Sequence, residues 1–282
     1  MNFGGLGPEH SGAETSRFVV VPVPYDLTST YQTGARHGPS AILDASANME
    51  LYDEELQKET YRSGIYTMEA LTIDARGPQH MIRAVNRVTK KIIDAGKISI
   101  LLGGEHSISF GAVQAAKKKY PDLSVIQFDA HADLRDEYQG SPFSHASVAR
   151  RIVELCPLVQ VGIRSMSAEE AAFYKKSNIR SYSAEDVHGN KNIDKEICKH
   201  LKGDIYVTVD LDVLDPSIMP STGTPEPDGL SWRQLLCILK AVSRRCKVLG
   251  VDVVELSPIP GMVAPDFLAA KLIYRIMGYL SE

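Results

Sequence analysis

Two short runs in this chain bring carboxylate and imidazole side chains together at a spacing that suits metal binding. The first is Asp129-Ala130-His131-Ala132-Asp133, and the second is Asp210-Leu211-Asp212. Each follows an apolar, β-branched run that is typical of a buried strand. Because side chains alternate between faces along an extended chain, the polar groups of each run project to one side. Burying them without a cation would be costly, so we predict a metal site.

Each run on its own has a simpler interpretation, because a D-x-D after a strand is most often a helix N-cap or a turn. The D-x-H-x-D run is more specific, although a salt-bridged loop could also contain it. A third run, Gly103-Gly104-Glu105-His106-Ser107, follows the apolar residues 98–102 and places another imidazole at a strand end. Three such strand ends favour the metal site. The candidate ligands are His106, Asp129, His131, Asp133, Asp210 and Asp212.

Six ligands are too many for one catalytic ion with an open position, but they suffice for two ions if some carboxylates bridge. A set rich in carboxylate oxygen suits Mn²⁺ better than zinc, which favours thiolate and imidazole. Two divalent ions would acidify a water molecule between them and so supply a nucleophile near neutral pH. The residues therefore predict a two-ion hydrolytic centre.

Apolar, strand-like runs alternate with helix-like periodicity along the chain. This alternation predicts an α/β fold in which a mostly parallel sheet lies between two layers of helices. Ligands in such sheets bind beyond the carboxyl ends of the strands, where Glu255 also lies. We expect one domain over residues 1–282, with residues 1–16 flexible or loosely packed. The expected strands are 18–23, 98–102, 124–129, 158–163, 179–182, 205–209 and 247–253, and the expected helices are 39–57, 79–95, 107–119, 144–155, 167–176, 191–201, 231–244 and 264–280.

Composition narrows the class of protein. A formal net charge of −4 and 44% hydrophobic residues are ordinary for a globular protein, and they give no sign of a nucleic-acid partner. The four cysteines are widely spaced and form no C-x-x-C pair, which favours a reducing compartment over a disulfide scaffold or structural zinc. Met1–Ser16 lacks the apolar core of a signal peptide, and no apolar run is long enough to span a membrane. We expect a cytoplasmic protein without a membrane partner.

The chain resembles the ureohydrolase family, which contains arginases, agmatinases, guanidinobutyrases and formiminoglutamases. The resemblance extends from Gly34 to the last expected helix, and five motifs occur in the family's order. It implies a three-layer arginase-like α/β fold, two Mn²⁺ ions per chain, hydrolysis of a guanidinium-like carbon, and a homotrimer or homohexamer. The motifs are G-G-E-H-S at 103–107, D-A-H-A-D at 129–133, S-H-A-S at 144–147, D-L-D-V-L-D-P at 210–216 and V-V-E-L-S-P at 253–258.

The resemblance also implies roles for single residues. His106 would bind one ion and His131 the other, with the aspartates distributed between them. His145 would carry the proton to the leaving amine, although taken alone it reads as a helix-start or surface histidine. Glu255 would accept hydrogen bonds from the substrate guanidinium, and its simpler interpretation is a strand-end salt bridge. Asp133 is expected among the catalytic groups as well as the metal ligands.

The choice of substrate depends on the segment that follows the D-x-H-x-D motif. Arginases usually carry an Asn two residues after this motif, where the chain has Arg135. The segment 134–141 resembles that of agmatinases, and we expect Arg135 and Ser141 to contact the substrate. The acidic Asp136 and Glu137 would suit a cationic amine.

A second segment, Gly223-Thr224-Pro225-Glu226-Pro227, also resembles agmatinases, although Asp228 stands where the family often has Gly. The leading expectation is an agmatinase, which converts agmatine and water to putrescine and urea in polyamine synthesis. The alternatives are an arginase, a guanidinobutyrase, an N1-aminopropylagmatine ureohydrolase, or a metal-binding homologue without catalytic activity.

Overall fold

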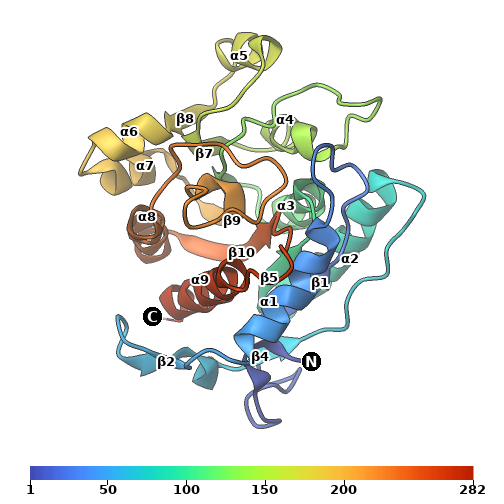
Figure 1. The fold of residues 1–282 in the computed structure, drawn as a ribbon, viewed down its shortest axis with the longest axis vertical. Helices are drawn as coiled ribbons and strands as arrows, with labels where there is room; N and C mark the ends of the chain where they lie inside the picture. The colour runs from blue at the N-terminus through green and yellow to red at the C-terminus, as the bar shows by residue number, and fades with distance from the viewer. Residues whose placement is uncertain (282) are drawn as a thin grey trace.

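The computed structural model describes residues 1–281, which form a β-sheet between two layers of helices (Figure 1). Within these residues the central sheet has eight strands, and every neighbouring pair is parallel. In spatial order the strands are β4 (Ile65–Thr67), β1 (Phe18–Val23), β5 (Ile98–Gly103), β10 (Lys247–Val254), β9 (Asp204–Asp210), β6 (Ser124–Phe128), β7 (Leu158–Ile163) and β8 (Arg180–Ser183).

Two separate apolar clusters lie on the two faces of the sheet. The alternation of side chains along β5 shows this directly, because Ile100 and Leu102 belong to one cluster and Leu101 belongs to the other. The predicted fold class, a parallel α/β sheet with both faces covered, is therefore confirmed. The first cluster is covered by α1 (Gly38–Ser46), α6 (Ala184–Gly189), α7 (Ile193–His200), α8 (Trp232–Arg245) and α9 (Ala264–Leu280), and the second by α2 (Pro78–Asp94), α3 (Ser109–Lys119) and α4 (Val148–Val153), with α5 (Ala168–Tyr174) beside it.

The predicted helix over residues 39–57 is wrong beyond α1. The chain turns into a short antiparallel hairpin, β2 (Tyr52–Asp53) and β3 (Lys58–Glu59). The Asp53 side chain accepts hydrogen bonds from the backbone of Glu55 at 3.0 Å and Leu56 at 2.9 Å, which stabilises the turn. Its other oxygen lies 2.6 Å from Arg275 Nε on α9. This long-range ion pair holds the hairpin on the last helix.

Short elements account for the other differences. The predicted helix over 144–155 divides into the 3₁₀ turn η5 (His145–Ser147) and the shorter α4. Strand β4 and helix α6 were not predicted, and each has six residues or fewer. At the N-terminus, Phe3 in the 3₁₀ turn η1 (Phe3–Gly5) is fully buried in the first apolar cluster. The expectation of a single domain stays a prediction.

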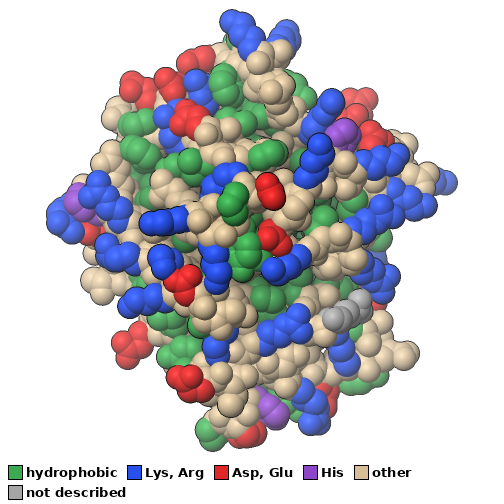
Figure 2. All heavy atoms as spheres, turned by 180° about the vertical axis from the view of Figure 1, so that it is seen from behind, with side chains coloured by type: hydrophobic (Ala, Val, Ile, Leu, Met, Phe, Trp, Pro, Cys, Tyr) green, Lys and Arg blue, Asp and Glu red, His purple; other side chains and the backbone are tan. Residues whose placement is uncertain are grey.

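The surface carries charges of both signs. The face shown in Figure 2 presents Lys and Arg side chains across much of its width, with Asp, Glu and uncharged residues between them. In the part of the chain that the structure describes, no helix is both long and apolar enough to cross a membrane.

Candidate metal centre and substrate cavity

The motif-bearing loops meet at one edge of the sheet. Strands β5, β10, β9 and β6 are consecutive in the sheet, and all four end at this edge because they are parallel. The turn after β5 is closely packed: a Cβ on Gly104 would lie 2.1 Å from the carbonyl oxygen of Tyr25, so only glycine fits. The next amide, from Glu105, donates to that same oxygen at 2.7 Å. This contact places His106 at the start of η4 (His106–Ile108).

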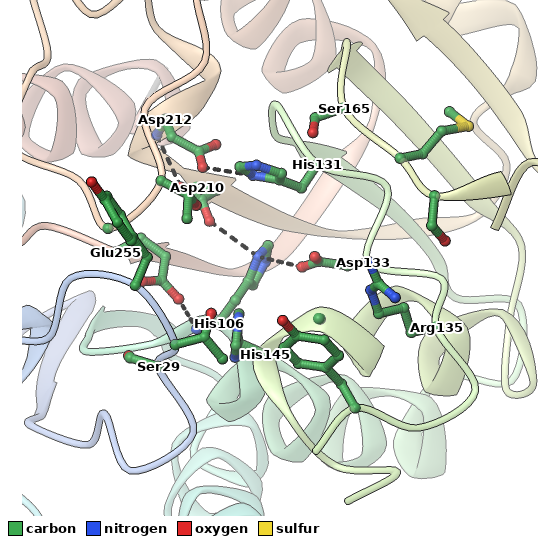
Figure 3. A pocket seen from close by; sticks show the side chains of 18 of the residues that line it. Ser29, His106, His131, Asp133, Arg135, His145, Ser165, Asp210, Asp212 and Glu255 are labelled. Atoms are coloured by element: carbon green, nitrogen blue, oxygen red, sulfur yellow. Dashed lines mark hydrogen bonds and ion pairs between the residues drawn. The ribbon is translucent and has the colours of Figure 1, made fainter. Parts of the chain in front are cut away.

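Three carboxylates converge on one nitrogen of His106. Its Nδ1 lies 3.1 Å from Asp129 Oδ2. It also lies 3.3 Å from Asp133 Oδ2 and 3.4 Å from Asp210 Oδ2, the two contacts that Figure 3 marks. The imidazole is buried, and Nδ1 is left without a well-formed hydrogen bond. The predicted ligands from β5, β6 and β9 therefore come together in the structure.

The other ring nitrogen of His106 is fixed by a buried pair. Nε2 lies 2.8 Å from Thr208 Oγ1, and that hydroxyl donates its single proton to Asp252 Oδ1 at 2.6 Å. Thr208 must then accept a hydrogen bond from Nε2–H. In the neutral imidazole this assignment leaves the lone pair on Nδ1, which faces the carboxylates. Buried partners of this kind commonly orient metal-binding histidines.

A second cluster shares Asp129 with the first. His131 Nδ1 lies 2.9 Å from Asp212 Oδ2 and 3.8 Å from Asp129 Oδ1. Asp129, His131 and Asp212 are close enough to hold one metal ion, as are His106, Asp129 and Asp210. Two metal positions bridged by one carboxylate are thus compatible with the side chains.

The carboxylates repel one another inside the protein. Burial and the neighbouring charges of Asp212 and Asp129 raise the pKa of Asp210 well above its ordinary value. Burial and Asp129 raise the pKa of Asp133 to about 7. Burial opposes protonation of His131, but the Asp212 carboxylate beside it raises its pKa to about 11. Divalent cations would relieve this repulsion, so the donor set fits the predicted metal ions.

Glu255 lies at the end of β10 beside the first cluster. It has a φ of 67°, and its amide donates to Gly104 O at 2.7 Å. One carboxylate oxygen accepts from the backbone N–H of His106 at 2.7 Å. The other oxygen is available to a ligand in the cavity that Glu255 lines. A non-glycine residue in the left-handed region is unusual, and such backbone strain is concentrated at functional sites.

His145 is the first residue of η5 and lines the same cavity as Glu255. Its Nδ1 lies 3.3 Å from Thr28 Oγ1, and its ring packs edge-to-face with that of Tyr138 at a centroid distance of 5.9 Å. Burial, followed by the nearby His106 and His131, lowers the pKa of His145 to about 4. The imidazole is therefore neutral at pH 7 and can act as a proton acceptor or as a hydrogen-bond donor.

The cavity above the clusters has a volume of about 290 Å³. Arg135 lines it, with Nε 3.9 Å from Glu170 Oε2 and its guanidinium 4.8 Å from the centre of the Tyr138 ring. Ser141 is not among the lining residues; its hydroxyl accepts from the amide of Phe143 at 3.2 Å. The predicted substrate contact of Arg135 is thus compatible with its position, whereas the structure does not bring Ser141 to the cavity wall.

Sequence reasoning missed two loops of this cavity. One follows β1 and contributes residues 29–32, and the other follows β7 and contributes residues 165–167 together with Glu170. Both loops begin at carboxyl ends of predicted strands. Strand position alone could have identified them, but their residues lack metal-binding character.

The sequence profile of the Arginase family matches residues 16–278, which is nearly the whole chain. The chain belongs to the arginase family. This confirms the predicted resemblance to ureohydrolases, which are hydrolases acting on the C–N bonds of amidines. The family depends on two metal ions, in agreement with the two clusters of His and Asp side chains.

Individual members of the family resemble this ureohydrolase over most of its length. An N(1)-aminopropylagmatine ureohydrolase of Thermus thermophilus is 40% identical, with 97% of this chain and 93% of the relative covered. An agmatinase of Pyrococcus horikoshii is 35% identical, with 93% and 91% covered. The crystal structure of an agmatine ureohydrolase of Thermoplasma volcanium superimposes with a TM-score of 0.90 at 31% identity, covering 100% of this chain and 95% of that structure.

Proposed function

We propose that this ureohydrolase releases urea from a guanidino amine without a carboxylate, with N1-aminopropylagmatine as the preferred substrate and agmatine as the second. The cavity supports the substrate class: Glu255 and residues of both clusters line it, and Arg135 on its wall already faces Glu170. A substrate carboxylate would have to compete with Glu170 for that cation. A polyamine-like chain carries no carboxylate and avoids this competition.

We rank the two substrates by the sequence identity between this chain and the relatives named for each of them. The relatives named for N1-aminopropylagmatine share 38–40% identity with this chain, whereas those named agmatinase share 33–35%. Agmatinase was the leading expectation from the sequence. We place agmatine second because the more similar relatives are named for the longer substrate.

We propose two Mn²⁺ ions per chain as the cofactor. His106, Asp129, Asp133 and Asp210 would hold one ion, and Asp129, His131 and Asp212 the other. The ions would supply an acidified water as the nucleophile for the guanidinium carbon. The support is the crowding of buried carboxylates around Nδ1 of His106, which lacks a well-formed hydrogen bond.

The protein's own groups would position the substrate and move the proton. The free oxygen of Glu255 would accept from the guanidinium, whose planar N–H groups match a carboxylate. Asp133, which also lines the cavity, would contact the attacking water in addition to its role as a ligand. His145, neutral at pH 7, would first take up a proton released by the attacking water at its unprotonated ring nitrogen and would then pass it to the departing amine. Hydrolysis of agmatine would then give putrescine and urea.

The deciding experiment is urea release from a panel of guanidino compounds after Mn²⁺ loading. We expect the highest kcat/KM for N1-aminopropylagmatine, then agmatine, with L-arginine and 4-guanidinobutyrate lower. A preference for L-arginine would indicate an arginase. Bound metal without urea release from any compound would favour a homologue without catalytic activity.

We also propose that the protein is cytoplasmic and forms a homotrimer or homohexamer. Light scattering of the purified protein would test the number of subunits.

A further inference from the structure

A buried carboxylate that lies outside the two metal clusters sits beneath the loop after β1. Both oxygens of Glu105 accept hydrogen bonds: Thr28 N donates to Oε2 at 2.5 Å, and Ser107 Oγ donates to Oε1 at 2.6 Å. The Thr28 hydroxyl donates to the same Oε1 at 2.5 Å. Glu105 is fully buried, so its carboxylate is oriented by hydrogen bonds to Thr28 and Ser107 and not by contact with water.

These contacts determine what the Thr28 hydroxyl offers to His145. A threonine hydroxyl has one proton, and here that proton is directed to Glu105. The oxygen can therefore only accept from His145, whose backbone N–H lies at 3.1 Å and whose Nδ1 lies at 3.3 Å. An acceptor at Nδ1 requires the proton of the neutral ring to be on Nδ1. The Nε2 atom is then the unprotonated nitrogen.

We propose that Thr28 and Glu105 are positioning residues that hold His145 in its Nδ1–H tautomer and leave Nε2 free to exchange a proton with substrate. The inference rests on the proposed role of His145 in urea release. The Tyr138 ring also packs against the His145 ring in an edge-to-face arrangement. Because Glu105 directly precedes His106, one turn orients both the proton carrier and a proposed metal ligand.

A purely structural role for Thr28 must be separated from this one. Its backbone N–H also donates to Glu105, and this bond does not involve the side chain. Thr28→Ser keeps the hydroxyl, whereas Thr28→Val keeps the shape and removes the acceptor. The matched pair therefore isolates the hydroxyl, which bonds Glu105 as well as the backbone N–H and Nδ1 of His145, and the tautomer measurement separates the contact at Nδ1 from the other two.

The first measurement is the tautomer of His145 by ¹⁵N NMR of histidine-labelled protein at pH 7.5, with its signal assigned by its absence in His145→Ala. We expect the Nδ1–H form in the wild type and in Thr28→Ser, and a shift toward Nε2–H in Thr28→Val. An Nε2–H form in the folded wild type would overturn the proposal, whatever the variants do.

The second measurement is the kinetics of urea release by the Mn²⁺-loaded variants. We expect Thr28→Val to lower kcat on the order of 10-fold to 10²-fold, to change KM little and to shift the pH profile, because an incorrectly protonated ring is a poorer proton carrier. Thr28→Ser should restore kcat to within about threefold. An unchanged kcat and pH profile in Thr28→Val, with metal content equal to wild type, would contradict the proposal. Failure of the wild type to release urea would contradict the proposed function instead, and the tautomer measurement would still decide the role of Thr28.

Discussion

Asp129 Oδ2 lies 3.1 Å from Nδ1 of His106, while the second oxygen of the same carboxylate faces the other cluster. This carboxylate is common to both groups that could hold a metal ion. Removing Asp129 should therefore affect both metal positions, whereas removing a side chain that belongs to one group should affect only one position.

We expect Asp129→Ala to lose both tightly bound ions and all measurable urea release, because it removes the shared ligand. His131→Ala should weaken one ion selectively, by at least about 10-fold. Metal analysis after dialysis of the Mn²⁺-loaded protein measures how many ions each variant retains. Asp204→Asn, at the opposite end of the strand that carries Asp210, is the matched control and should retain two ions. A wild type that holds a single tight ion would contradict the two-ion proposal.

The metal-free protein should become less stable as the pH rises from about 4 to about 8. Asp133 has a folded pKa of about 7, above its ordinary 3.8, so the folded state retains a proton that the unfolded state has already released. The raised pKa of His131 acts in the same direction, since its stabilisation is lost as the pH rises from 6.5 toward 11. The lowered pKa of His145 opposes this trend, but only between about pH 4 and 6.5, where the larger shift of Asp133 outweighs it. Calorimetric melting in EDTA at pH 5 and pH 8 tests this. Asp133→Asn should reduce the pH dependence, and a higher melting temperature at pH 8 than at pH 5 would contradict the argument.

His145→Ala should lower kcat on the order of 10²–10⁴-fold, with a smaller effect on KM, because a positioned proton carrier is lost. Metal content should stay at the wild-type value, since His145 is not close enough to join either cluster. Steady-state kinetics across pH 6–10 provide the measurement, with His200→Ala on α7 as a control histidine. A wild-type kcat in His145→Ala would show that another group moves the proton.

L-Arginine should be a poorer substrate than agmatine by on the order of 10²-fold in kcat/KM. Its carboxylate would enter a cavity where Arg135 already faces Glu170, and an unpaired, partly desolvated carboxylate costs a few kcal/mol. Both substrates are compared in the wild type and in Arg135→Ala. If L-arginine is hydrolysed efficiently by the wild type but not by Arg135→Ala, then Arg135 binds the carboxylate and the enzyme is an arginase.

Asp228→Gly should stabilise the protein by up to about 1 kcal/mol, because residue 228 has a φ of 64° and glycine adopts this conformation without a Cβ penalty. The gain is partly offset by loss of the exposed contact with His188 at 3.4 Å, which is worth little. Thermal unfolding of the metal-loaded variant gives the difference. Asp228→Ala, which loses the same contact without gaining glycine's freedom, is the control and should not stabilise.

The sheet and the metal clusters were predictable from sequence because they depend on strong local patterns. Long apolar runs identify the strands, and parallel strands bring their carboxyl ends to one edge, so His106, Asp129 and Asp210 could be grouped without coordinates. The helix predicted over residues 39–57 was wrong after residue 46 because the structure there depends on a distant contact and not on a local pattern. Asp53 is held by Arg275, which lies more than 200 residues away, and no local pattern reports that contact.

The surroundings of His145 could not be predicted either. Thr28 and Glu105 become partners only because β1 and β5 are neighbours in the sheet, although α1 and α2 separate them along the chain. A threonine in a loop and a glutamate in a turn have many ordinary roles. Only the distances identify their relation to His145.

The order of the strands has a consequence for the folding of the nascent chain during its synthesis. Strand β10 lies between β5 and β9 although it is made after both, and the cluster around His106 takes side chains from the ends of β5, β6 and β9. A nascent chain that has not yet released residues 247–254 from the ribosome lacks the strand that sets the spacing between His106 and Asp210. Metal uptake would then have to wait until β10 has emerged and paired, and a chain truncated before residue 247 should be unable to acquire metal.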